Sequence, residues 1–310
     1  MDHEDKPFSR DELEAAGGVC HPDPLTARLL EAAAPGTTQR HGDCCSIRLW
    51  SEWPQMLDAL PSLGEMLVAT GNDCAILGER RIYPEMEFGE SFRCGRGVDG
   101  SLAGQFVPWH VGFAACHHHP DGCSHSVEFR DEANAVLHKI CLTENSLRDR
   151  FVDWVDFHQA IPSESRMTAA FSPARWRTVP QRHWFDYDEI EQLPSHALEG
   201  ILRFAAEQRA PVCVVVGNEG MEQRAELAPG SIQARQQWIF ASDDRVGLHF
   251  DPSRLGDHIL HHAPAHTGDA STLSLKSFNE DGDLRLALSA PPHLSGAEWT
   301  AFLAAAIRSL

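Results

Sequence analysis

Cysteine and histidine side chains are concentrated in one short stretch of this 310-residue chain. Cys116, His117, His119 and Cys123 lie on either side of the turn Pro120-Asp121-Gly122. Thiolates and imidazoles are ligands that suit zinc, and donors on both sides of a turn can converge on one ion. The spacing is not the paired C-x-x-C pattern of a structural zinc site, so a hairpin tip with solvated histidines fits the same residues.

A second group of histidines comprises His258, His261, His262 and His266, on a predicted strand and the turn after it. Alternation along a strand sends His261 and His262 to opposite faces, which makes them a poor chelating pair. The pattern favours a sheet edge or surface, and His261 would approach a bound ligand if its face lined a cleft.

Motifs of other catalytic classes are missing from the sequence. No G-x-S-x-G elbow marks a nucleophilic serine. Gly217-Asn218-Glu219-Gly220 follows the apolar segment Val212 to Val216, but it lacks both G-x-G-x-x-G and G-x-x-x-x-G-K-[ST]. A β-turn is the better interpretation of these four residues.

Short strands joined by turns position most of these groups. Strands are predicted near 65–70, 74–78, 86–92, 103–107, 110–116, 123–130 and 135–142, and a second sheet near 211–289. Apolar residues at helical spacing predict helices at 11–15, 24–34, 53–60, 146–157, 198–205 and 298–310. Because the strand connections are short, the strands should pair antiparallel.

The bulk composition excludes several classes of partner. A formal charge of −19 repels nucleic-acid phosphates and anionic membranes. Met1 to Lys6 is acidic without an apolar run behind it, and no stretch of about 18 apolar residues predicts a membrane span. Nine cysteines without a regular framework suit a reducing compartment. We therefore expect a soluble cytoplasmic protein without membrane insertion.

Two stretches of the chain repeat one plan. Residues 63–142 begin with an apolar strand ending in Thr70-Gly71-Asn72, and residues 212–288 begin with one ending in Val216-Gly217-Asn218. Such a repeat indicates a tandem duplication. The expected organisation is a first repeat at 1–157, a join at 158–175 and a second repeat at 176–310, and the expected fold class is α+β.

The order of motifs in both halves resembles the cytoplasmic haemin-degrading, or haem-trafficking, proteins of bacterial haem-uptake systems. The resemblance covers roughly 46–155 and 176–307. Its residues in the first half are Arg48 to Pro54, Leu63 to Asn72, Trp109 to Ala114, Phe129 to Asp131 and Val136 to Ile140. Those in the second half are Ser195 to Leu198, Val216 to Gly220, Trp238, Leu248-His249 and Ser277 to Gly282.

This resemblance implies two homologous halves, each a large curved antiparallel sheet with packed helices, and a b-type haem held between sheet and helices. It also implies the iron ligand. The family's Trp-x-x-x-x-Asp-x-His-x-Phe-Phe-like stretch corresponds to residues 176–186, in which His183 is the matching histidine. Gln181 and Asp186 depart from that pattern, and only eleven residues separate His183 from Ser195.

Other residues near the same segment are candidates for ligating the haem iron and for binding its propionates. His158 and Met167 are the substitute axial ligands. The turns after the first strand of each repeat lack the arginines common in the family, which leaves Arg175, Arg177 and Arg182 as candidate partners of the haem propionates.

The resemblance predicts that the chain binds haem for trafficking to, or participation in, haem degradation and iron acquisition. A haem oxygenase or a haem importer would be its protein partner. If the protein is an enzyme, the resemblance implies that it opens the haem ring. The alternative is a descendant with an altered cleft that serves as a non-haem binding or regulatory protein.

Overall fold

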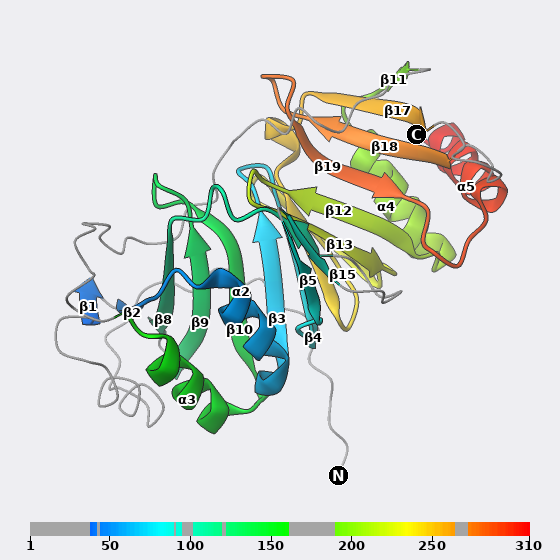
Figure 1. Ribbon diagram of the computed structural model, residues 1–310. Helices are drawn as coiled ribbons and strands as arrows, with labels where there is room; N and C mark the ends of the chain where they lie inside the picture. The colour runs from blue at the N-terminus through cyan, green and yellow to red at the C-terminus, as the bar shows by residue number, and fades with distance from the viewer. Residues whose placement is uncertain are drawn as a thin grey trace, which may run out of the picture.

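The computed structural model describes residues 38–41, 44–89, 91–94, 102–119, 122–160, 190–263 and 272–310. Nineteen strands and four α-helices in these ranges form two antiparallel sheets, as the predicted α+β class requires. Figure 1 shows helices α2 (Trp53–Ala59) and α3 (Arg148–His158) against one sheet, called sheet A, and α4 (Ala197–Gln208) and α5 (Gly296–Arg308) against the other, called sheet B. Among the described residues, no helix combines the length and apolar character needed to cross a bilayer.

Sheet A has ten strands, in the order β1-β2-β8-β9-β10-β3-β4-β16-β15-β14. Their bounds are β1 Thr38–His41, β2 Cys44–Leu49, β8 Val111–His119, β9 Gly122–Arg130, β10 Val136–Ser146, β3 Gly64–Gly71, β4 Ala75–Ile82, β16 Val246–Phe250, β15 Trp238–Ser242 and β14 Ser231–Arg235.

Sheet B has nine strands, in the order β11-β17-β18-β19-β12-β13-β7-β6-β5. Their bounds are β11 Ile190–Leu193, β17 Asp257–Ala263, β18 Thr272–Phe278, β19 Leu284–Ser289, β12 Val212–Gly217, β13 Met221–Leu227, β7 Leu102–Gly104, β6 Phe92–Cys94 and β5 Met86–Phe88.

The two sheets exchange strands between the halves of the chain. Strand β4 of the first half pairs with β16 of the second, and β13 of the second half pairs with β7 of the first. Each half therefore completes the sheet of the other. The repeated sequence plan does not reveal this exchange, and it predicts one strand at 86–92 where the structure has the two short strands β5 and β6.

Helices form close to where apolar periodicity predicts them, at α2 Trp53–Ala59, α3 Arg148–His158, α4 Ala197–Gln208 and α5 Gly296–Arg308. Pro54 lies in the first turn of α2, where its missing N–H costs no helical hydrogen bond. A capping box of Ser295 and Glu298 begins α5. The helices predicted at 11–15 and 24–34 lie outside the described residues, as do residues 161–175 of the expected join.

Two hydrophobic cores fill the space between the sheets and the helices. One core joins α2 and α3 to sheet A and to Phe92, Leu102 and Met221 of sheet B. The other joins α4 and α5 to sheet B and to Leu77 and Leu248 of sheet A. The inner faces of both sheets are thus buried, and the outer face of each sheet points away from these helices.

A reciprocal pair of asparagines lies where the two sheets cross. The Asn72 side-chain amide donates to the carbonyls of Gly217 (2.9 Å) and Arg285 (2.8 Å), in the other half. The Asn218 amide donates to the carbonyls of Gly71 (2.8 Å) and Leu137 (2.7 Å). Each side-chain oxygen also accepts two backbone N–H groups of its own turn. All hydrogen-bonding positions of both amides are therefore occupied.

We predict that Asn72→Ala lowers the free energy of unfolding by about 3 kcal/mol, because it leaves buried carbonyl and N–H groups without partners. Urea denaturation measures the change. Asn145→Ala is the matched control and should cost less than about 0.5 kcal/mol, since the exposed Asn145 amide donates, among the described residues, only to Glu65 (2.9 Å). Equal costs for the two variants would contradict the role given to Asn72.

Candidate functional site

The described residues contain part of the site expected from the sequence. His183, Met167, Arg175, Arg177 and Arg182 lie within 161–189, outside the described residues. That segment leads directly into β11, the edge strand of sheet B. Strand β11, and with it the edge of sheet B, is therefore the described element that follows these residues in the chain.

One row of directly opposed residues crosses this outer face. Arg224 on β13 lies opposite Val215 on β12, and Val215 lies opposite Ala287 on β19. Ala287 lies opposite Lys276 on β18, which in turn lies opposite Ile259 on β17. Opposed residues point to the same face, so Lys276 and Arg224 flank an apolar strip. Val212, Val214 and Val216 alternate with this row and face the core.

The charged groups of this face are only partly hydrated. Lys276 is 7% exposed, and burial lowers the pKa of its ammonium group. Burial raises the pKa of Glu222 to about 7, against the opposing effect of Arg224, whose Nη2 lies 3.7 Å from Glu222 Oε1. The buried Nε of Arg224 has no hydrogen-bond partner among the described residues.

This arrangement can receive a flat apolar molecule with acidic groups at its edge. Val215, Ala287 and Ile259 offer apolar contact, whereas Lys276 and Arg224 offer cations in a poorly hydrated setting where charge-assisted hydrogen bonds are strong. The sequence interpretation missed Lys276 and Arg224. Alternation in Met221–Leu227, where Glu222, Arg224 and Glu226 interrupt apolar or buried residues, was the available signal.

The histidines of β17 divide between the faces of sheet B, as alternation predicts. His261 lies on the outer face opposite Ser274 and is 4% exposed. His258 lies on the inner face, where its Nδ1 bonds Ser277 Oγ (2.8 Å) and its Nε2 bonds the Ser195 carbonyl (2.8 Å). His261 is therefore the histidine of this strand that shares a face with Lys276.

The cysteine and histidine hairpin is formed by β8 and β9. Cys116 lies opposite His125, and the register places Cys123 on that same face, whereas His117 is on the opposite face. The structure thus separates His117 from the two cysteines, and the side chain of His119 lies outside what the structure describes. Within the described ranges, no group of three or more His, Cys, Asp or Glu residues could hold a metal ion.

His117 belongs instead to a buried charge network on the outer face of sheet A. Its Nε2 lies 3.1 Å from Glu128 Oε1, which also lies 3.0 Å from Lys139 Nζ, and Arg130 binds Oε2. Burial alone would raise the pKa of Glu128, but Lys139, His117 and Arg130 hold it well below its ordinary value. The carboxylate is therefore ionised and compensated, which fits a structural network.

The bulge between β9 and β10 matches the bulge between β18 and β19, so Glu128 and Lys276 occupy equivalent positions in the two repeats. Each residue is two positions before the strand's final residue, Arg130 in one repeat and Phe278 in the other. The outer face of sheet A thus has an ion-paired acid where the outer face of sheet B has a cation.

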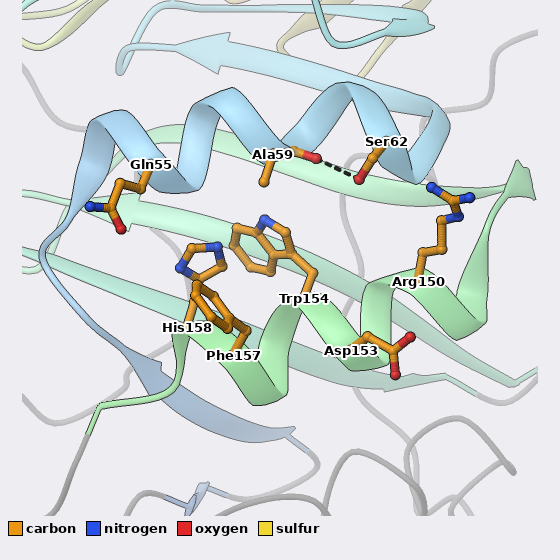
Figure 2. A pocket seen from close by; sticks show the side chains of 8 residues that line it. All are labelled: Gln55, Ala59, Ser62, Arg150, Asp153, Trp154, Phe157 and His158. Carbon is orange, nitrogen blue, oxygen red and sulfur yellow. Dashed lines mark hydrogen bonds between the residues drawn. The ribbon is translucent and has the colours of Figure 1, made fainter.

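His158 is the one substitute ligand within the described residues. It is the last residue of α3 and lines a cavity between α2 and α3, on the inner side of sheet A (Figure 2). Burial lowers the pKa of its imidazole. The structure therefore places His158 away from the outer face of sheet B.

Comparison with known proteins connects this chain to haem proteins. Residues 32–158 match the family model described as the haemin-degrading HemS.ChuX domain. The hemin transport protein HemS of Yersinia enterocolitica is 23% identical over 272 residues, which cover 76% of this chain and 77% of HemS. HmuS of Yersinia pestis, also a hemin transport protein, is 23% identical over 274 residues, with the same coverage. The resemblance identified from the residues is confirmed.

Solved structures share the duplicated fold. The heme-binding protein PhuS of Pseudomonas aeruginosa, in its holo form, matches with a TM-score of 0.71 and 19% identity, over 83% of this chain and 86% of PhuS. The heme degrading enzyme ChuS of Escherichia coli O157:H7 matches with a TM-score of 0.72 and 19% identity, over 84% and 86%. The fold class predicted from the sequence is confirmed.

We predict that Glu222→Gln raises the free energy of unfolding at pH 8 by roughly 1–2 kcal/mol and leaves it unchanged near pH 4.5. A carboxyl whose folded pKa is raised to about 7 loses stability as pH rises through that value, whereas glutamine does not titrate. Urea denaturation at both pH values measures this. Glu226→Gln, an exposed carboxylate on the same strand, should change neither value, and an equal gain for both variants would contradict the prediction.

Proposed function

We propose, from the relationship of residues 32–158 to the haemin-degrading HemS.ChuX domain, that this chain binds haem as its cargo for trafficking or breakdown. The observation that carries the proposal is the outer face of sheet B, where Lys276 and Arg224 flank an apolar strip. A porphyrin ring requires apolar contact, and its propionates require cations or hydrogen-bond donors.

The chemistry of the donors suits this ligand. Lys276 and Arg224 are separated by three strand spacings, about 14 Å, and long side chains can turn inward toward the two propionates. The orphaned Nε of Arg224 offers a donor within the site. Glu222 beside it loses its negative charge as it protonates near pH 7, which reduces repulsion of a propionate.

His183 is the proposed axial ligand. It lies seven residues before Ile190, the first residue of β11, and seven extended residues span at most about 25 Å. Strand β18 with Lys276 is two strands away from β11, about 10 Å. His183 can therefore reach the apolar strip. Arg175, Arg177 and Arg182 remain proposed propionate partners from the same segment, and Met167 a substitute ligand.

Haem, once bound, supplies the iron and the oxidisable ring, and the residues of this chain hold and orient it. We propose that the protein works in the cytoplasm and passes haem to a degrading enzyme, after receiving it from an importer. The relatives include both a transport protein and a degrading enzyme, so transfer and ring opening are two outcomes for the same bound complex.

We predict that the purified protein binds haemin with a sharp, saturable Soret band. His183→Ala should abolish the part of the Soret shift that coordination by the axial ligand produces. Absorbance titration measures this. Lys276→Gln should keep the band position but weaken affinity by about tenfold, because it removes one charge-assisted hydrogen bond.

His196→Ala is the control, since His196 is exposed and stands at the N-cap of α4, which packs on the inner face of sheet B. It should bind as the unaltered protein does. Broad absorbance that never saturates, in both the unaltered protein and the control, would overturn the proposal.

We further predict that reductant and oxygen, added to the saturated complex, distinguish the two outcomes. A carrier keeps its Soret band, whereas a degrading enzyme loses the band and yields a ring-opened product that chromatography identifies. Catalase is included to remove hydrogen peroxide, which would otherwise bleach haem without enzymatic action. A band that disappears equally fast for haemin without protein would contradict enzymatic ring opening.

A further inference from the structure

The cavity that His158 lines, between α2 and α3, lies far from the outer face of sheet B (Figure 1). It has a volume of about 560 Å³, within the range of small-molecule sites. Its lining is Gln55, Ala59, Ser62, Arg150, Asp153, Trp154, Phe157 and His158. We call it the α2–α3 groove. Figure 2 shows the rings of Trp154 and His158 projecting from α3 into this gap toward α2.

One polar atom in the groove, Trp154 Nε1, is buried without a partner among the described residues. Trp154 and His158 are each 5% exposed. Within the part of the chain that the structure describes, Trp154 Nε1 has no hydrogen-bond acceptor, and the His158 ring contacts the rings of Trp154 and Phe157. An unpaired buried donor costs about 1–3 kcal/mol, and a ligand that pairs with it recovers this free energy.

The rings of the groove are arranged to contact a flat molecule. The Trp154 and His158 centroids are 4.8 Å apart, and those of Phe157 and His158 are 4.9 Å apart at 89°. Phe157 is 77% exposed at the rim, which is unusual for a large aromatic side chain. An aromatic cluster that is open on one side favours a planar, apolar ligand.

Charge and protonation narrow the class of ligand further. Arg150 lies at the end of the groove opposite Gln55, with Ser62 near it, and the groove's one carboxylate, Asp153, lies one turn further along α3 (Figure 2). A guanidinium group matches a carboxylate. Burial lowers the pKa of His158, so its imidazole is neutral at pH 7 and can coordinate a metal ion.

We propose that the α2–α3 groove is a second binding site, separate from the outer face of sheet B, for a planar tetrapyrrole that carries carboxylates. The imidazole of His158 meets the centre of the ring, and Arg150 meets a carboxylate at its edge. The choice of a tetrapyrrole rests on the proposed function. The unpaired Trp154 donor and the exposed aromatic rim, which mark the groove as a site, do not depend on it.

Haemin titration of four proteins tests the second site: the unaltered chain, His183→Ala, His158→Phe, and the double variant. His158→Phe keeps an aromatic ring beside Trp154, and circular dichroism confirms that each variant is folded. The unaltered chain should bind two equivalents of haemin, each single variant should retain one saturable Soret band, and the double variant should retain none.

Arg150→Gln supplies a second measurement, because Arg150 is exposed and its replacement leaves the fold intact. In the His183→Ala background it should weaken haemin binding by about tenfold without moving the band, as expected for a carboxylate partner. Arg148→Gln, also exposed on α3 but outside the groove, is the matched control and should leave affinity unchanged.

The outcomes separate the two proposals. A saturable band that depends on His158 but not on His183 supports the groove and overturns His183 as ligand. A band that depends on His183 alone, unchanged by His158→Phe, overturns the groove and leaves the outer-face site standing. Binding that neither variant alters overturns both histidine assignments.

Discussion

The structure depends on two asparagine amides at the point where its sheets cross. Asn72 and Asn218 each close their own turn through two backbone N–H groups and donate to two carbonyls of the other half. An aspartate would lose the donors, and an apolar residue would leave four backbone groups unpaired in a buried place. The turns are therefore fixed in shape and in mutual position by the same side chains.

This crossing decides where chemistry can take place. Gln223 reinforces it by donating to the Val68 carbonyl (3.0 Å), and the cores on either side seal the inner faces of both sheets. Ligands are left with the outer faces and the spaces between helices. The outer faces have diverged, because Glu128 is neutralised by Arg130 and Lys139, whereas Lys276 in the equivalent position stands beside an apolar strip.

Local apolar spacing predicts the four described α-helices and most strands, and the repeated order of motifs predicts the duplication. Neither could predict that β4 pairs with β16, since pairing between distant strands leaves no local signal. Gly71-Asn72 and Gly217-Asn218 were interpreted as turns lacking cations, although their asparagines hold the halves together. The sequence does not identify Lys276 and Arg224 as site residues for a related reason. They lie on different strands, and only the pairing of the intervening strands places them on one face.

The exchange of β5, β6 and β7 for β14, β15 and β16 bears on how such a chain arose. A single repeat would leave the free edge of its β4 equivalent exposed, with three strands that have no sheet of their own to join. Two identical copies that exchanged these strands would pair the free edge of each sheet. A symmetric dimer with two identical outer faces is therefore the expected ancestor of this fold. Fusion into one chain removed the requirement that the two faces stay alike, so one face could become a network of buried ion pairs while the other has cations beside an apolar strip.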